Sequence, residues 1–177
     1  MPKEVKMTEE WAAKIKLLIL DVDGVMTDGR IILNDQGEEI KYFHVKDGHG
    51  LRRLLRAGID VLIITGRKSK AVEHRAKDLE IREVYQGVKD KGSLCKELIQ
   101  LKGLDKEQVC CMGDDLPDLP MFGLTGASVA VADAASELRA AALYVTKNRG
   151  GDGAVREVCE LILKAQDRWP HFPDGRE

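Results

Sequence analysis

The segment "LLILDVDGVMTDGR", residues 17–30, brings two aspartates, Asp21 and Asp23, directly after four apolar residues. A short apolar run that ends in polar residues and glycine is typical of a strand buried on both faces. The two carboxylates would then lie close together at the end of that strand. Because like charges a few ångströms apart cannot all stay ionised without a positive partner, the pair indicates a cation site.

Other side chains that could take part in chemistry stand at the ends of later apolar runs. Asp114 and Asp115 end the run "VCCMGDD", and Thr65 ends the run "VLIIT". Lys91 comes a little past the run "EVYQG". Ligands of an open α/β sheet bind outside the carboxyl ends of its strands, so we expect these residues to share one crevice.

Such a set of side chains favours phosphoryl transfer. Mg²⁺ binds oxygen ligands from one or two carboxylates, waters and a substrate phosphate, while a lysine and a threonine hydroxyl suit the phosphate itself. An aspartate beside a metal ion can also attack phosphorus and form an aspartyl-phosphate. A second acid two residues further on is placed to protonate the leaving oxygen and later to activate water, which explains a pair of aspartates.

Apolar runs alternate with helical patterns along the chain, which favours βαβ units and an α/β fold with a doubly wound, mostly parallel sheet. The amphipathic segment 48–57, for example, places Leu51, Leu54 and Leu55 on one face. The predicted strands are 17–20, 61–65, 83–87, 109–115, 127–131 and 142–146. The predicted helices are 48–57, 68–79, 89–102, 133–141 and 152–166.

One segment breaks this alternation. Residues 29–45, "GRIILNDQGEEIKYFHV", hold two β-prone stretches around "NDQG", which is typical of a hairpin. The hairpin follows the paired aspartates directly, so it is placed to form a flap over the site or a strand pair used in assembly. Residues from about 168 to 177 are predicted to form a loose tail.

The composition is that of a soluble globular protein with a single domain over residues 1–177. Hydrophobic residues make up 44% of the chain and charged residues 33%, and the net charge of −2 gives no bias toward nucleic acid or an anionic membrane. The four cysteines lack a metal-ligand spacing and are predicted to be reduced thiols. We expect a cytoplasmic protein, because the sequence lacks a signal-peptide pattern and a run of about 20 apolar residues.

Four ordered motifs, "DVDGVMTDG", "IITGR", Lys91 in "GVKDKG" and "GDDLPD", resemble those of the haloacid dehalogenase superfamily, whose fold is Rossmann-like. By this resemblance Asp21 is the nucleophile and Asp23 the general acid/base. Thr65 and Lys91 would hold the phosphate. The resemblance therefore assigns a separate catalytic role to each residue that the strand ends bring together.

The same resemblance implies a Mg²⁺ cofactor. Its protein ligands would be Asp21, Asp114 and the backbone carbonyl of Asp23. Asp115 and Asp118 would be supporting acids.

The chain resembles the capless branch of the superfamily. Only the hairpin fits between Asp23 and the helix at 48–57, and the stretch from Thr65 to Lys91 is too short to hold a cap domain. The resemblance to this branch implies a homotetramer in which the hairpins pack together and a neighbouring subunit helps to close each site. We therefore expect a homotetramer that acts on a small molecule, without a nucleic-acid or membrane partner.

The resemblance extends over nearly the whole chain and implies a phosphatase of an eight-carbon keto-deoxy sugar acid used in lipopolysaccharide biosynthesis. Arginines suit such a substrate, because their planar fork binds a carboxylate through two hydrogen bonds. By the pattern of the branch, residues 150–156 would reach a neighbour's site. The residues implied to contact substrate are Asp23, His44, Val45, Lys46, Asp47, Gly48, Arg52, Arg67, Arg75 and Lys91.

Three other functions fit part of the sequence. A sister capless phosphatase acts on a nine-carbon keto-deoxy sugar phosphate, but it tends to have an acid where Arg67 stands. A non-catalytic tetramerisation module, like the capless domain of sialic-acid-activating enzymes, can lose motif residues, whereas all four motifs are present here. A phospho-signalling receiver needs an acid after its third strand, where "EVYQG" offers none.

Overall fold

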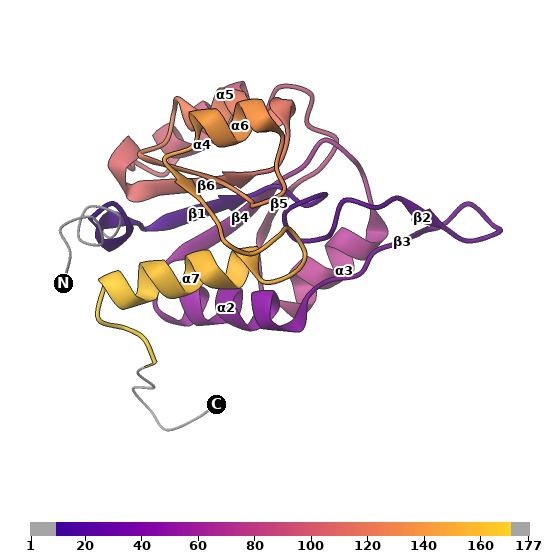
Figure 1. The fold of residues 1–177 in the computed structure, drawn as a ribbon, viewed down its shortest axis with the longest axis horizontal. Coiled ribbons are helices and arrows are strands. Elements are labelled where there is room, and N and C mark those ends of the chain that lie inside the picture. Colours follow the sequence, from indigo (N-terminus) through magenta and orange to yellow (C-terminus); the bar gives the residue numbers. More distant parts are fainter. Residues whose placement is uncertain (1–9, 171–177) are drawn as a thin grey trace.

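The structure is a computed structural model that describes residues 10–170. Its central sheet consists of the strands β1 (Leu17–Leu20), β4 (Asp60–Ile64), β5 (Glu83–Tyr85), β6 (Val109–Gly113), β7 (Ala127–Ala130) and β8 (Tyr144–Val145). All neighbours in this sheet are parallel, in the order β5-β4-β1-β6-β7-β8 (Figure 1). This confirms the predicted doubly wound parallel sheet, with every strand within two residues of its predicted range.

β1 lies between β4 and β6, and its sequence explains this central place. All four of its residues are fully buried, as expected for a strand that is covered on both faces. Leu20 at its end is paired with Ile63 of β4 on one side and with Met112 of β6 on the other. The carboxyl ends of these three strands therefore lie side by side.

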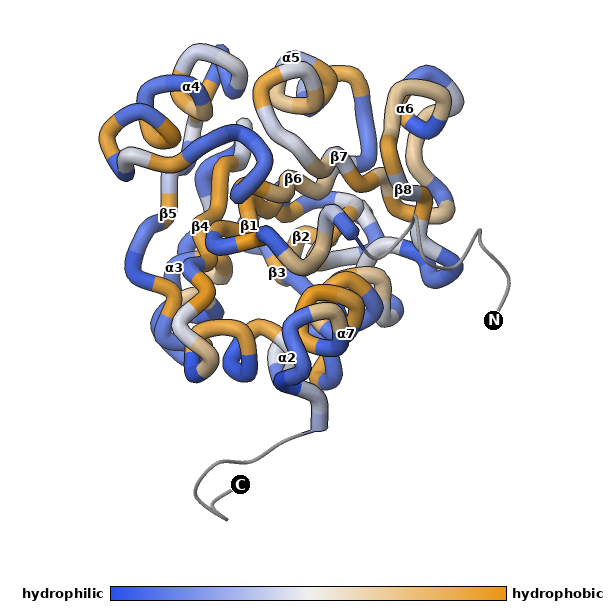
Figure 2. Tube along the Cα trace, turned by 90° about the vertical axis from the view of Figure 1, so that its left-hand side faces the viewer, coloured by the Kyte–Doolittle hydropathy of each residue, from blue (hydrophilic) through white to orange (hydrophobic). Residues whose placement is uncertain are grey.

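Helices cover both faces of the sheet. They are α2 (Val45–Arg56), α3 (Lys70–Asp78), α4 (Lys91–Leu101), α5 (Leu119–Phe122), α6 (Ser136–Ala141) and α7 (Ala154–Ala165), with 3₁₀ helices η1 (Ala12–Lys14), η2 (Lys106–Gln108) and η3 (Leu116–Asp118). In Figure 1, α4, α5 and α6 lie on one face of the sheet, and α2, α3 and α7 lie on the other. Figure 2 shows the largely hydrophobic strands between these two layers.

The helix predicted at 48–57 begins at Val45 in the structure. Gly48 and Gly50, which disfavour a helix locally, lie inside the predicted range and near the start of the observed helix. Both glycines are buried against other helices: a Cβ on Gly48 would lie 2.2 Å from Arg75 Nη2, and one on Gly50 would lie 3.1 Å from Cys159 Cβ. The first part of α2 is therefore packed closely against α3 and α7.

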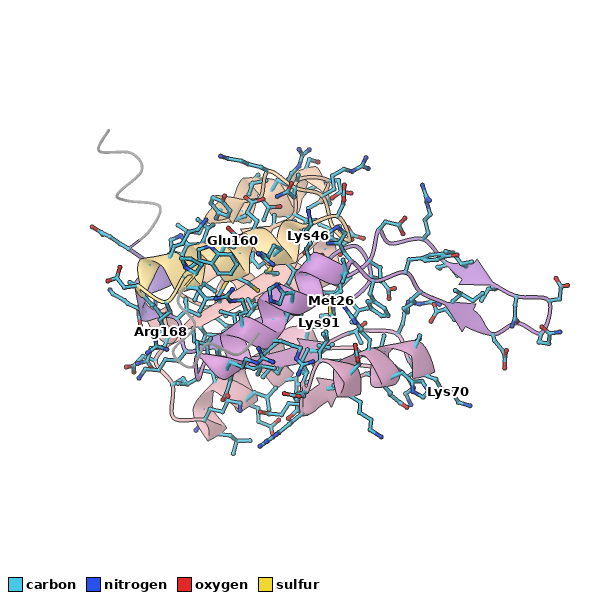
Figure 3. All side chains as sticks on the ribbon, turned by 90° about the horizontal axis from the view of Figure 1, so that it is seen from below. Met26, Lys46, Lys70, Lys91, Glu160 and Arg168 are labelled. Carbon is cyan, nitrogen blue, oxygen red and sulfur yellow. The ribbon has the colours of Figure 1, made fainter. Side chains whose placement is uncertain are left out.

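The predicted hairpin is confirmed. It consists of β2 (Ile32–Leu33) and β3 (Glu39–Ile40), which pair antiparallel. Asn34 closes the turn, since its Oδ1 accepts hydrogen bonds from the backbone N–H groups of Gln36 and Glu38 at 3.0 and 2.8 Å. Figure 3 shows that the hairpin extends well beyond the body of the molecule.

Residues 171–177 of the predicted loose tail lie outside the described residues, but residues 168–170 lie within them and are packed. Arg168 donates a hydrogen bond to the carbonyl of Ala57. The ring of Trp169 lies 4.4 Å from the guanidinium carbon of Arg53 and 4.6 Å from that of Arg156. This corrects the prediction for the first part of the tail, which is held on α2 and α7 by cation–π contacts.

The four cysteines are free and buried, which confirms the prediction of unpaired thiols. They lie in the packed elements α4, β6 and α7. Within residues 10–170, no helix has both the length and the apolar character that a membrane span requires.

Candidate active site

Lys91 is the first residue of α4, and its ammonium group lies at the centre of the site. Its side chain is 5% exposed and lies 2.8 Å from Oδ1 of Asp21, which follows β1. It also lies 2.6 Å from Oδ1 of Asp118, whose side chain is 1% exposed. Burial alone would lower the pKa of Lys91, but the two carboxylates raise it above its usual value, so this lysine stays charged.

Asp118 also holds the acidic turn that follows β6. Its Oδ2 accepts a hydrogen bond from the backbone N–H of Asp114 at 3.0 Å and a longer one from that of Asp115 at 3.4 Å. The carboxylate of Asp115 points to the start of η3, where it accepts a hydrogen bond from Leu116 N–H. Asp118 therefore connects Lys91 to the backbone that carries Asp114.

Carboxylate oxygens of Asp21, Asp114 and Asp118 lie within 4.8 Å of one another. Burial, reinforced by Asp118 and opposed by Lys91, raises the pKa of Asp21 to about 6. Burial and the neighbouring carboxylates raise the pKa of Asp114 to about 8. One lysine cannot neutralise three acids, so a hard divalent cation with oxygen ligands fits this donor set. Asp21 and Asp114 are the acids left to hold it, because both oxygens of Asp118 already have partners.

The loop after β1 leaves room for Asp114 because it contains Gly24. This residue has a φ of +86°, and a Cβ built on it would lie 2.0 Å from Asp114 Oδ2. On Gly150, which follows β8 in sequence, a Cβ would lie 1.7 Å from the carbonyl oxygen of Gly24. Glycine is required at both positions, since the backbones and the carboxylate approach more closely than any side chain allows.

Residues 150–156, which are expected to reach a neighbour's site, also make contacts within their own chain. Gly151 N–H donates to the carbonyl of Val25 at 2.9 Å. Arg156 N–H donates to Asp47 Oδ1 at 2.8 Å. The segment therefore joins the loop after β1 to the start of α2 in its own chain.

Thr65 lies directly after β4 and is 2% exposed. Its backbone N–H donates to the carbonyl of Tyr85, and its carbonyl accepts from Val88 N–H. Because β4 is the neighbour of β1, Thr65 is held at the same carboxyl edge of the sheet as Asp21. The structure thus brings the four predicted catalytic positions to one edge.

The carboxylate of Asp23 points toward the base of the hairpin. Its Oδ1 accepts a hydrogen bond from Lys41 Nζ, and its Oδ2 lies 3.8 Å from Arg67 Nε. Both cations also contact Glu39 Oε1, at 3.2 Å from Lys41 and 2.8 Å from Arg67. Sequence reasoning missed Lys41 and Glu39, since the pattern of a hairpin does not show which of its side chains face a site. The position of the hairpin directly after Asp23 was the signal that could have found them.

The substrate residues predicted at the start of α2 differ in their surroundings. Val45 and Lys46 are exposed, whereas Asp47 and Gly48 are buried. Burial raises the pKa of Asp47, although the hydrogen bond from Arg156 N–H opposes this shift. Asp47 thus has a structural role that the resemblance did not imply, because it binds the first turn of α7.

The predicted arginines lie on α2, on α3 and on the loop before α3. Arg52 Nη2 lies 2.9 Å from Glu80, and Arg75 Nη1 lies 2.7 Å from Asp78. His44 is half-buried, with Nδ1 at 3.9 Å from Asp47 Oδ1. Arg67 has a side chain that is 48% exposed. The structure therefore brings His44 and Arg67 close to acids of the site region, and pairs Arg52 and Arg75 with acids of α3 and of the turn after it.

A parallel sheet with two aspartates after its central strand, a lysine at a helix start and an acidic turn after the next strand is the arrangement expected of a haloacid dehalogenase-like hydrolase. A profile of haloacid dehalogenase-like hydrolases matches residues 80–158. These residues include Lys91 and the acidic turn, and the motif of Asp21 lies before them.

Known proteins place the chain more closely. It is 54% identical over 157 residues to the 3-deoxy-D-manno-octulosonate 8-phosphate phosphatase of Yersinia pestis, a match that covers 89% of this chain and 84% of the relative. It is 50% identical over 157 residues to the enzyme of that name from Escherichia coli K12, with the same coverage. The chain therefore belongs to the haloacid dehalogenase-like hydrolases, in the family of these 8-phosphate phosphatases.

Solved structures agree. The 8-phosphate phosphatase of Moraxella catarrhalis, in complex with a magnesium ion, a phosphate ion and a KDO (3-deoxy-D-manno-octulosonate) molecule, matches with a TM-score of 0.90 and 44% identity over 93% of this chain and 94% of that chain. The cobalt-bound phosphatase of Haemophilus influenzae matches with a TM-score of 0.86 and 41% identity over 89% of this chain and 92% of that chain. Both of these similar structures hold a divalent cation.

Magnesium binding should depend on pH. The pKa values of Asp21 and Asp114 are raised from 3.8 to about 6 and about 8, so the metal-free protein loses stability as the pH rises through this range. Mg²⁺ binds the ionised acids and offsets this loss. We expect the rise in melting temperature on adding Mg²⁺ to be small at about pH 5.5 and to grow up to about pH 8.5, measured by scanning fluorimetry. Asp114→Asn should remove most of this growth, and a rise that is the same at every pH would contradict the assignment.

Gly24→Ala should displace the carboxylate of Asp114, because the added Cβ would occupy its position. We expect Mg²⁺ affinity, measured by calorimetry, to fall about 10- to 100-fold. Gly58→Ala is the matched control, since Gly58 has a similar φ of +77° but nothing within 4 Å of its Cβ position. If both variants lost the same Mg²⁺ affinity, the cause would be backbone strain and not the displacement of Asp114.

Proposed function

We propose that this protein hydrolyses 3-deoxy-D-manno-octulosonate 8-phosphate to KDO and phosphate, with Mg²⁺ as cofactor, in the supply of a lipopolysaccharide sugar. The names of its relatives and the magnesium, phosphate and KDO in the Moraxella catarrhalis complex support the substrate and the metal. The observation that carries the reaction class is the group of Asp21, Asp114 and Asp118 around the buried ammonium of Lys91.

In the first step, a carboxylate oxygen of Asp21 attacks phosphorus, and the bond between phosphorus and the sugar oxygen breaks. Asp23 gives its proton to that sugar oxygen, which leaves as the hydroxyl of KDO. Lys91 and Thr65 hold the phosphoryl group, and Lys91 also fixes the attacking carboxylate at 2.8 Å. The product of this step is an aspartyl-phosphate on Asp21.

In the second step, water attacks phosphorus and Asp23 takes its proton, so the bond between phosphorus and Asp21 breaks. Phosphate is released, and both aspartates return to their first states. Mg²⁺, bound by Asp21 and Asp114, supplies positive charge that offsets the charge of the phosphate and of the carboxylates. The raised pKa values of these two acids are consistent with a site that needs this charge.

The sugar acid would bind through the cations at the mouth of the site. Arg67 is half exposed and is the arginine near Asp23, so it is placed to bind the carboxylate of the substrate while the phosphate lies at Asp21. Lys46 is exposed at the start of α2 and adds positive charge there. A sugar acid phosphate carries a negative group at each end, and the two sets of cations match this distribution.

We propose that four copies assemble through their hairpins and that the enzyme works in the cytoplasm. The apolar side chains that the hairpin and the segments beside it expose support this assembly, because a two-stranded ribbon gains little by exposing them. Their exposed fractions are Ile31 58%, Leu33 58%, Ile40 42% and Tyr42 71%.

Asp21→Asn should lose phosphatase activity by about 10³-fold or more, since an amide is not a nucleophile for phosphorus. The assay is phosphate release with Mg²⁺ from eight- and nine-carbon keto-deoxy sugar phosphates and from small phosphomonoesters. We expect the eight-carbon sugar acid to have the highest kcat/KM. Preference for the nine-carbon substrate would reassign the sugar, and equal rates on all esters would reduce the function to that of a general phosphatase.

Leu33→Asp should break the proposed assembly, because it places a charge on the apolar hairpin surface. Light scattering after size exclusion should give a tetramer for the wild type and smaller species for the variant. Leu101→Asp is the control, since Leu101 is 74% exposed on α4, away from the hairpin. A wild-type monomer, or a Leu33→Asp tetramer, would contradict the assembly.

A further inference from the structure

The hairpin has one face toward the site and one face toward solvent. Exposure alternates along β3 and the two residues that follow it. The side chains of Glu39 and Lys41 are 13% and 1% exposed. Ile40 and Tyr42, which alternate with them, are 42% and 71% exposed. This alternation is the two-residue period of an extended strand. The buried face therefore presents a carboxylate and an ammonium group to the active site.

These two groups complete a closed ring of charges around Asp23. Lys41 and Arg67 each contact both Asp23 and Glu39, so two cations alternate with two carboxylates. The contact of Lys41 with Asp23 is a hydrogen bond, whereas that of Arg67, at 3.8 Å, is longer than one. Lys41 is therefore the cation that fixes the direction of the Asp23 carboxylate.

The exposure of the two cations separates their roles. Arg67 is 48% exposed and can turn toward a ligand, whereas Lys41 is enclosed and has no such freedom. A buried ion pair adds little to stability compared with apolar side chains of similar size, because desolvation offsets the attraction. Methionine at position 41 would leave the carboxylates of Asp23 and Glu39 with one cation fewer, so the melting temperature of such a variant is measured beside its kinetics.

We propose that Lys41 is a positioning residue that holds the carboxylate of Asp23 for proton transfer to the leaving sugar oxygen and then from the attacking water. Asp23 is two residues from Asp21, and its carboxylate must face the sugar oxygen and not the acids around Lys91. The hydrogen bond from Lys41 holds it on the hairpin side of the site. This inference rests on the proposed function, in which Asp23 is the general acid.

The leaving group gives a readout that a purely structural role would not change. An alkoxide leaving group needs a proton, whereas p-nitrophenolate is a weak base and leaves without one. We expect Lys41→Met to lower kcat/KM for the sugar acid phosphate about 10- to 100-fold and to lower kcat/KM for p-nitrophenyl phosphate far less, because kcat/KM covers the steps up to loss of the leaving group and not the later attack of water. Lys41→Gln, whose amide is too short to take the place of Nζ, should lower the ratio of the two kcat/KM values in the same direction.

Lys102→Met is the matched control. Lys102 also bridges two carboxylates, Glu83 and Asp60, but it lies at the C-terminus of α4. Its loss should leave the ratio of the two kcat/KM values unchanged. Melting temperatures measured beside the kinetics show which variants are folded, and the ratio from Lys41→Gln decides the question if Lys41→Met does not fold.

Equal losses on both esters, or wild-type kinetics in a folded Lys41 variant, would overturn the role of Lys41. Failure of the proposed function has a different signature, because wild-type protein with Mg²⁺ would then show no preference for the sugar acid phosphate or would not hydrolyse it. A normal ratio in Lys102→Met together with a lowered ratio in both Lys41 variants would support the assignment.

Discussion

The arrangement of the site depends on the repulsion among three carboxylates, two of them buried and that of Asp114 half-buried. Asp21, Asp114 and Asp118 have oxygens within 4.8 Å of one another, and Lys91 supplies one positive charge among them. Burial, reinforced by the excess of negative charge, raises the pKa of Asp21 and of Asp114. A divalent cation relieves this repulsion. Its positive charge also allows an anionic phosphate ester to bind beside carboxylates that would otherwise repel the ester.

Much of the surrounding structure serves to bring these charges together. β1 and β6 are neighbours, so the residues that follow them meet at one edge of the sheet. Gly24 and Gly150 let three chain segments approach within distances that any side chain would prevent. Asp118 binds Lys91 with one oxygen and the acidic turn with the other, which makes the position of Asp114 depend on that of Lys91.

The sequence was sufficient for the sheet and for the acids and lysine at its edge, because apolar runs and their terminal residues are local patterns. It was not sufficient to predict the roles of side chains that are positioned by contacts between residues far apart in sequence. Asp47 binds the start of α7, a contact across more than a hundred residues, and no local pattern indicates it. Lys41 and Glu39 lie in a hairpin that was predicted correctly, but which of its faces meets Asp23 depends on how it folds back. The close packing of Gly48 on Arg75 and of Gly50 on Cys159 likewise joins elements far apart in sequence.

One face of the hairpin presents Lys41 to Asp23 and the other exposes apolar side chains, so the proposed assembly would bring the neighbours close to the site. Mass spectrometry of peptides from enzyme quenched with acid during turnover of the sugar acid phosphate tests most directly whether Asp21 is the nucleophile. The peptide that contains Asp21 should gain the mass of one phosphoryl group, located on Asp21 by fragmentation, and should lose it when substrate is exhausted. Active enzyme with no phosphorylated peptide, or with the phosphoryl group on Asp23 or another residue, would contradict this account of the site.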